Sequence, residues 1–222
     1  MKRSLSLYRS LSALVAVLGL TAVPARATIV YGQVDDFEDD TTQFWVGGAG
    51  PANIPTGGPA GGGDNYLQLV AFGGNGPGSR IGAYNDNQWT GDYLGEGVTA
   101  IEADVRNFGS TGDLSLRLLF FGAGGNLTSN LSILLPNDGD WHHVVFGVTP
   151  ADLTSVDGGF DVNATLSGTT RLLIRHQAGP PGGQFAGTIV IGELGIDNIA
   201  AVPEPTALAL LVVGAFAIRK RR

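Results

Sequence analysis

Apolar and polar side chains alternate along several short stretches of this chain, which is the pattern of β-strands with one buried face. Residues 98–106 place Ile101, Ala103 and Val105 on one side and charged side chains on the other. Residues 113–121 repeat this pattern with an apolar side chain at every second position. Further stretches of the same kind are residues 65–71, 79–84, 130–135, 141–148, 170–176 and 187–199. The chain is therefore predicted to form about eight or nine short strands.

The segments between these strands are rich in Gly, Pro, Asn and Asp, which is typical of turns. Residues 47–63 read GGAGPANIPTGGPAGGG and predict a flexible surface loop. No stretch keeps a helical period, and residues 149–156 predict at most one helical turn. The pattern favours an all-β fold, an antiparallel β-sandwich of jelly-roll-like form.

The two ends of the chain have a different composition from its middle. Residues 1–27 combine three early cations, an apolar run and the sequence Ala25-Arg26-Ala27, which predicts a signal helix removed by signal peptidase during export. At the other end, residues 206–218 form a short hydrophobic segment, predicted to be helical, that is shorter than a bilayer core requires. Because positive charges stay on the cytoplasmic side, the domain between these segments, residues 28–201, is predicted to lie across the membrane.

Residues 202–222 carry three consecutive features that resemble a known sorting signal. Proline and glutamate form the first, the hydrophobic segment is the second, and four cations are the third: Val202, Pro203, Glu204, Pro205 and then Arg219, Lys220, Arg221, Arg222. This order is similar to the PEP-CTERM signal of Gram-negative bacteria. The resemblance implies recognition by an exosortase, transient insertion in the inner membrane, and delivery to the cell surface or the extracellular matrix of a biofilm. A simple tail anchor is the alternative.

The charge of the chain is unevenly distributed. The whole chain has 13 basic and 20 acidic residues, but residues 28–201 keep five arginines, no lysine and 19 acidic residues, a formal charge of −14. This charge argues against nucleic acid and anionic membranes as partners, and it favours cations, neutral sugars or solubility alone. The absence of cysteine excludes disulfides, thiol catalysis and thiolate zinc sites.

The order of features in residues 34–200 resembles jelly-roll carbohydrate-binding modules: VDDFEDD opens the domain, Trp45 follows, GDNYLQL forms an early strand and LGIDNI closes it. In such modules the first and last strands are neighbours, and carboxylates there hold a structural calcium ion. The resemblance implies Glu38 and Asp197 as ligands. Asp36 and Asp39 are candidate helpers, and Asp64 could approach from the next strand. Solvated acidic loops are the alternative.

Contacts to an extracellular polysaccharide are predicted on the polar strand faces. Trp89, Tyr93 or Tyr84 could stack on sugar rings beside a platform of charged side chains, which comprises Arg106, Arg117, Arg171, Arg175, Glu102 and Asp104. The alternative is a salt-bridged solvent face with the aromatic residues in the core. Trp45 and Trp141 are predicted to be core residues.

An enzyme requires a carboxylate pair or an activated nucleophile. The stretch EADVRN at residues 102–107 resembles the strand motif of laminarinase-type hydrolases, but Arg106 and Asn107 stand where the third acid belongs. The sequence therefore predicts a non-catalytic, exported surface or matrix protein that associates with exopolysaccharide. The alternative is an extracellular glycan-degrading enzyme or its accessory carbohydrate-binding module.

Overall fold

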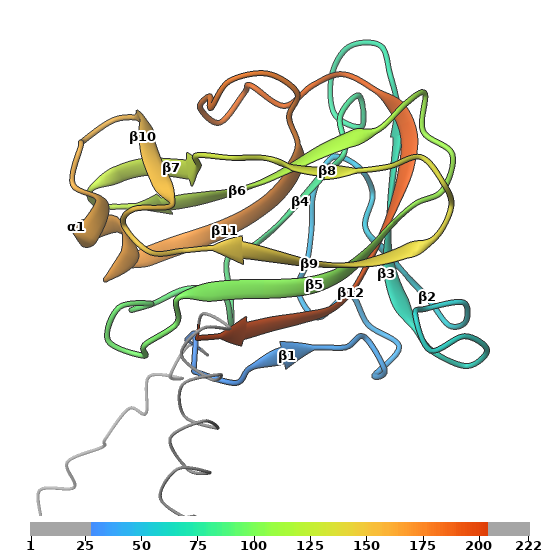
Figure 1. Ribbon diagram of the computed structural model, residues 1–222, viewed down its shortest axis with the longest axis horizontal. Coiled ribbons are helices and arrows are strands. Elements are labelled where there is room, and N and C mark those ends of the chain that lie inside the picture. Colours follow the sequence, from blue (N-terminus) through green and yellow to red (C-terminus); the bar gives the residue numbers. More distant parts are fainter. Residues whose placement is uncertain (1–27, 204–222) are drawn as a thin grey trace, which may run out of the picture.

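The computed structural model describes residues 28–203. The predicted signal peptide (1–27) and most of the predicted sorting signal (204–222) lie outside the described residues. Residues 28–203 form a sandwich of two antiparallel sheets with six strands each (Figure 1). The all-β, jelly-roll-like sandwich predicted from the alternation is confirmed. Within the described residues, no helix is long and apolar enough to cross a membrane.

We name the two sheets A and B, and we call the face of each sheet that points away from the core its outer face. Sheet A has the order β2-β3-β12-β5-β9, with β1 paired to β12. Its strands are β1 (Val34–Asp35), β2 (Ala52–Ile54), β3 (Tyr66–Phe72), β5 (Ala100–Asn107), β9 (Trp141–Gly147) and β12 (Ile191–Val202). The pairing of Val34 with Ala200 puts the first and last strands side by side, as the resemblance implied.

Sheet B has the order β10-β7-β6-β11-β4, with β8 paired to β6. Its strands are β4 (Gly82–Asn85), β6 (Leu114–Gly122), β7 (Gly125–Ser129), β8 (Ile133–Leu135), β10 (Leu153–Asp157) and β11 (Thr169–His176). The apolar side chains of β6 at alternate positions, among them Leu116 and Phe120, are fully buried. They pack in one core with Ile101 and Val105 of β5. Burial of these rows is the main force that holds the two sheets together.

One buried carboxylate organises the aromatic end of the core. Asp35 of β1 accepts hydrogen bonds from the indole nitrogens of Trp45 at 2.8 Å and Trp89 at 2.6 Å. Gln88 donates a third bond to the same oxygen at 3.0 Å. Burial raises the pKa of Asp35 above its usual value, while the hydrogen bonds oppose that shift. The prediction that Trp45 is a core residue is confirmed.

Two local segments differ in detail from what their sequence pattern suggests. Residues 149–156, predicted to form at most one helical turn, contain turn residues that lead into β10, and the helix of the described residues is α1 (Val162–Leu166), capped by the Asp161 side chain. The segment 47–63 is also more ordered than predicted, because it contributes β2 as an edge strand paired with β3. The Trp141 indole donates to the carbonyl of Gly57, which ties the glycine-rich turn to sheet A.

Candidate functional site

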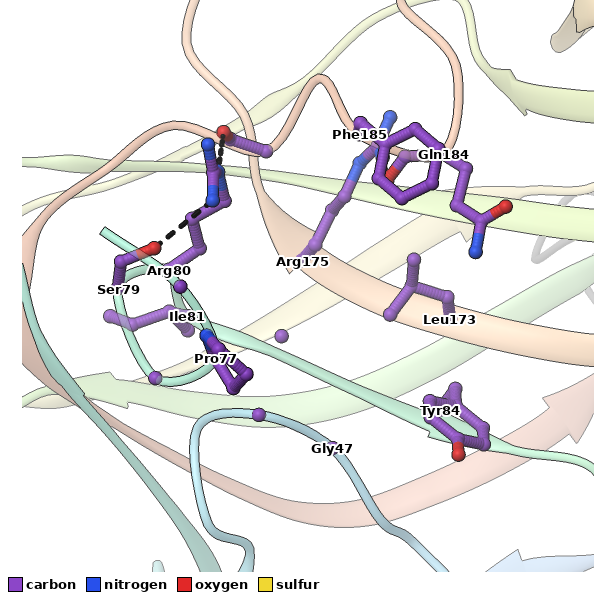
Figure 2. Close-up of a pocket in the computed structure, with 15 residues that line it drawn as sticks. Gly47, Pro77, Ser79, Arg80, Ile81, Tyr84, Leu173, Arg175, Gln184 and Phe185 are labelled. Atoms are coloured by element: carbon purple, nitrogen blue, oxygen red, sulfur yellow. Dashed lines mark hydrogen bonds between the residues drawn. The ribbon is translucent and has the colours of Figure 1, made fainter.

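A pocket of about 590 Å³ opens on the outer face of sheet B, over the edge strand β4 and its neighbour β11 (Figure 2). Its floor consists of strand residues, and its walls are three loops at residues 47–48, 76–80 and 184–187. Figure 2 shows Arg80 and Phe185 on two sides of this pocket, with Leu173 and Tyr84 toward one end. The volume lies in the range of small-molecule and cofactor sites in proteins.

Strand alternation places the floor residues. Ala83 and Asn85 of β4 are buried, so Tyr84 between them points to the outer face. On β11, Leu172 and Ile174 enter the core, and Leu173 lies opposite Tyr84 across the strand pair. Gly47 makes the close wall possible, because a Cβ atom there would lie 2.6 Å from the carbonyl oxygen of Gly82. The ring of Tyr84, the side chain of Leu173 and the main chain of Gly47 therefore face the pocket.

Arg175 fixes the loop that forms the upper wall. Its guanidinium donates to the carbonyls of Gly182, Gly183 and Gln184 and to the side chain of Gln177. Burial lowers the pKa of Arg175 to about 10, partly offset by the charge of Asp157, so the group remains a cation at neutral pH. The loop held in this way presents Phe185, whose side chain is 86% exposed. An exposed aromatic ring on an anchored loop is a typical ligand contact.

A second cation extends the site across sheet B. Arg171 of β11 lies over the ring of Tyr84, 4.2 Å from its centroid, and 5.5 Å from the centroid of Phe121. Asp86 accepts a bond from the same guanidinium at 3.4 Å. The side chain of Arg171 is 33% exposed, so part of it still faces solvent. The outer face of sheet B thus combines aromatic rings with the guanidinium groups of Arg171 and Arg175, which hydrogen bonds and ring contacts fix in place next to the pocket.

The structure separates the side chains that were predicted to contact a glycan. Trp89 and Tyr93 are 0% exposed, so neither ring has a surface on which a sugar could stack, and their prediction as contacts is wrong. Arg117 is on sheet B but 4% exposed, with its guanidinium bonded to the carbonyls of Ser129 and Gly179. Arg106 lies on sheet A, above the ring of Phe108 at 4.3 Å.

The predicted charged platform is therefore not one surface. Arg106, Glu102 and Asp104 share the outer face of sheet A, whereas Arg171 and Arg175 are on sheet B. Of the aromatic candidates, Tyr84 alone reaches the pocket. Sequence reasoning missed Phe185 and Arg80, because both are in or next to loops, where alternation gives no direction for a side chain.

Three aromatic rings occupy the outer face of sheet A. Tyr66 stacks on Phe108 with centroids 5.5 Å apart, and Trp141 meets Tyr66 edge-on at 5.4 Å. All three gather above Gly195 of β12, where a Cβ atom would lie 2.7 Å from Phe108 and 2.9 Å from Trp141. Trp141 is thus partly exposed on the outer face of sheet A, and it packs in this aromatic cluster rather than in the core between the sheets. The cluster is a small second core that holds the 47–63 segment.

The candidate calcium ligands divide into two groups. Asp197 is 1% exposed, and its burial, together with the charges of Asp64, Asp104 and Glu38, raises its pKa to about 7. A buried carboxylate surrounded by like charges needs a proton or a cation to offset them. The buried charge of Asp197 is thus the electrostatic feature that a bound cation would offset.

The remaining candidates do not join that group. Asp36 accepts bonds from the main chain of Glu38 and from Gln43, and Asp39 accepts two bonds from Thr41. Residues 28–203 contain no group of three His, Asp or Glu side chains arranged to hold a metal ion. A calcium ion at Asp197 would therefore need main-chain or amide oxygens among its six to eight ligands.

No protein family model and no curated protein matches this sequence. Solved structures do share its fold. The chain is similar to part of an exo-β-agarase, with a TM-score of 0.55 and 18% identity over 79% of this chain; it spans 25% of the length of that enzyme. A cellulose-specific carbohydrate-binding module of family 28 gives a TM-score of 0.49 and 14% identity, with 79% of this chain and 98% of the module covered. A family 11 carbohydrate-binding module from Clostridium thermocellum gives a TM-score of 0.47 and 17% identity, with 79% of this chain and 99% of the module covered. At these identities the likeness establishes a shared β-sandwich fold.

Proposed function

We propose that this protein is a non-catalytic polysaccharide-binding β-sandwich whose ligand lies in the sheet B pocket and extends over Arg171. The observation that carries the proposal is the exposed ring of Phe185 facing a pocket floored by Tyr84 and Leu173. Sugar rings have an apolar C–H face that packs on aromatic rings, and hydroxyl groups that need polar partners. The pocket offers both kinds of contact on a rigid sheet. The fold shared with part of an agarase favours the same class of ligand.

The proposal is tested by affinity electrophoresis in gels that contain agarose, mixed-linkage glucan, xylan, alginate or carrageenan. At least one of these gels should retard the protein. Phe185→Ala should weaken that retardation about tenfold, as expected for the loss of a stacked ring. Phe160→Ala is the matched control, because Phe160 is 87% exposed but does not line the pocket. Equal effects of the two variants, or no retardation in any gel, would refute the proposal.

The alternative is an extracellular glycan-degrading enzyme, or the accessory module of one. Similarity to a quarter of an agarase chain keeps the accessory-module alternative open. Incubation of the purified protein with the retarding polysaccharide separates the alternatives. Release of reducing ends that persists with fresh protein preparations would identify an enzyme, and binding without product supports a binding protein.

We also propose that the protein is exported and sorted by an exosortase, on the strength of Val202–Pro205, segment 206–218 and the basic tail 219–222. The prediction is that mature protein at the cell surface lacks the residues that follow the Pro-Glu-Pro motif. Mass spectrometry of protein recovered from its native cells measures this directly. Surface protein that still ends in Arg222 would contradict the proposal.

A structural calcium ion is our third proposal, with Asp197 and Glu38 as side-chain ligands and Asp64 near them. The support is electrostatic: three neighbouring carboxylates act on the buried Asp197. Calcium would replace the proton that otherwise neutralises Asp197, and it would tie the β1–β2 connection to β12.

A further inference from the structure

The basic residues of the domain are concentrated on one face. Four of the five arginines in residues 28–203 lie on sheet B or at its pocket: Arg80, Arg117, Arg171 and Arg175. Arg175 and Arg117 are directly opposite each other on β11 and β6. Arg80 precedes β4 and lines the pocket rim, where it is exposed. This clustering occurs in a domain whose formal charge is −14.

Two of these cations are buried next to neutral partners. Arg175 is 3% and Arg117 is 4% exposed, and their hydrogen bonds go to carbonyl oxygens and to Gln177. Among the described residues, neither forms an ion pair with a carboxylate; Asp157 acts on Arg175 only at longer range. The Nε groups of both arginines are buried without a hydrogen-bond partner. Arg175 therefore has only the more distant Asp157 as a counter-charge, and burial of a cation with so little compensation is costly unless a ligand supplies a negative charge.

The opposite face of the sandwich carries the opposite charge. The outer face of sheet A presents Glu102, Asp104 and Glu193 beside a single arginine, Arg106, and Asp197 is buried beneath that face. The two sheets of a sandwich are about 10 Å apart, and the outer side chains are farther apart still. The exposed charges of the two outer faces are in contact with solvent on opposite sides of the molecule, and ions of physiological salt solution attenuate the field of exposed charges beyond about 8 Å. A ligand on sheet B therefore encounters the field of the arginines and of Asp86 and Asp157 rather than the net charge of the domain.

We propose that the ligand of the sheet B pocket is an acidic polysaccharide, one that carries carboxylate or sulfate groups on its sugar rings. Arg80 at the rim contacts one anionic group. Its guanidinium is oriented by bonds to the Gly187 carbonyl and the Ser79 hydroxyl, which hold it at the pocket (Figure 2). Arg171 contacts a second group farther along the chain. Arg175 and Arg117 contribute their charge from below while they hold the loop and strand in place.

The spacing of these groups requires a polymer. Arg80 and Arg171 are the two contacts, and Arg80 lies two residues before Gly82, the pairing partner of Arg175. Arg171 is therefore farther from Arg80 along the sheet than from Arg175, which is four residues, or about 13 Å, away along β11. A single sugar ring cannot cover this distance, so an extended chain of several rings is needed. The exposed ring of Phe185, on the loop that Arg175 holds, and Leu173 of the pocket floor provide apolar contacts for the sugar rings, and this arrangement rests on the binding site proposed above.

The test compares Arg80→Gln and Arg171→Gln with Arg106→Gln, which removes the same charge from the outer face of sheet A. Titrations use alginate and carrageenan as carboxylated and sulfated probes, and agarose and mixed-linkage glucan as neutral ones. We expect Arg80→Gln and Arg171→Gln each to weaken acidic-glycan binding about fivefold to tenfold, and Arg106→Gln to leave it unchanged. Affinity for the acidic probe should also fall as salt is raised.

The outcomes separate this inference from the proposed function. Tight, salt-independent binding of a neutral probe that all three variants retain would overturn the acidic ligand and leave the polysaccharide-binding function in place. No binding of any probe would overturn both. A preference for alginate over carrageenan, or the reverse, identifies which anionic group the arginines recognise. Circular dichroism at matched temperature checks that each variant is folded.

Discussion

Replacement of Asp197 by asparagine tests whether burial and the neighbouring carboxylates of sheet A raise the pKa of Asp197. In the calcium-free protein the pKa of Asp197 is raised to about 7, against 3.8 for the ordinary carboxyl group. The folded state therefore holds a proton that the unfolded state releases between these two values. Because the folded state binds more protons, stability falls as pH rises through this window. The loss for Asp197 is about 4 kcal/mol, at about 1.4 kcal/mol for each pH unit.

Asparagine does not titrate, so Asp197→Asn escapes this loss. It has its own cost, since the side chain of Asn198 now donates to Asp197 at 3.2 Å and would lose that acceptor. A lost neutral bond costs about 1 kcal/mol. We expect the variant to be about 1 kcal/mol less stable than the wild type at pH 4 and about 3 kcal/mol more stable at pH 8.

The assay is urea denaturation followed by tryptophan fluorescence at pH 4, 6 and 8, with a chelator present. Comparison of variant with wild type at each pH cancels the other carboxylates, including Asp35, whose pKa is also raised. If the difference in unfolding free energy between the two proteins is the same at pH 4 and pH 8, the reasoning about Asp197 is wrong.

A calcium arm of the same experiment tests the metal proposal. At pH 8, calcium at about 100 times its dissociation constant should stabilise the wild type by about 2.7 kcal/mol and should leave Asp197→Asn unchanged. Asp39→Asn is the control, because Asp39 is exposed and bonded to Thr41, and this variant should keep the full calcium effect. An equal calcium gain in Asp197→Asn would place the ion elsewhere or show that the effect is non-specific.

Two further substitutions probe the packing. Asp35→Ala removes the acceptor of two buried indole N–H groups and should lower the unfolding free energy by about 3 kcal/mol. Asp36 is the neighbouring residue and is exposed to solvent, so Asp36→Ala should change the unfolding free energy by less than about 0.5 kcal/mol. Urea denaturation compares them, and similar losses would contradict the role given to Asp35. Gly195→Ala should displace Trp141, shift its emission to longer wavelength and cost about 1–3 kcal/mol through overpacking. If Gly195→Ala keeps the emission maximum and the unfolding free energy of the wild type, the aromatic cluster can rearrange around the added methyl group without loss of stability.

Alternation predicted the strands that have one buried face and one polar face. The rows of β5 and β6 entered the core as expected, because a period of two fixes the direction of each side chain in a strand. Segments too short for a clear period were missed, among them β1, β2 and β10. Such short strands are held by their partners rather than by their own pattern.

The candidate site was predicted only in part, because alternation separates inward from outward side chains but does not assign the outward ones to a sheet. Arg106 and Arg175 are equivalent in the sequence, yet they lie on opposite faces of the sandwich. Trp89 shows the other difficulty. It lies outside the strands, where no period applies, and its burial depends on a distant partner, Asp35. Tyr84 was identifiable because it belongs to an alternating stretch.

The length of β12 also orients the domain. This strand has 12 residues, so its two ends are about 36 Å apart. It starts just after Ile189, which bridges to Arg80 at the pocket rim, and it finishes beside β1 (Figure 1). The polypeptide therefore leaves the sandwich at Pro203, at the pole remote from the arginine-lined pocket. If the chain is attached to another structure beyond that point, the pocket faces away from the attachment.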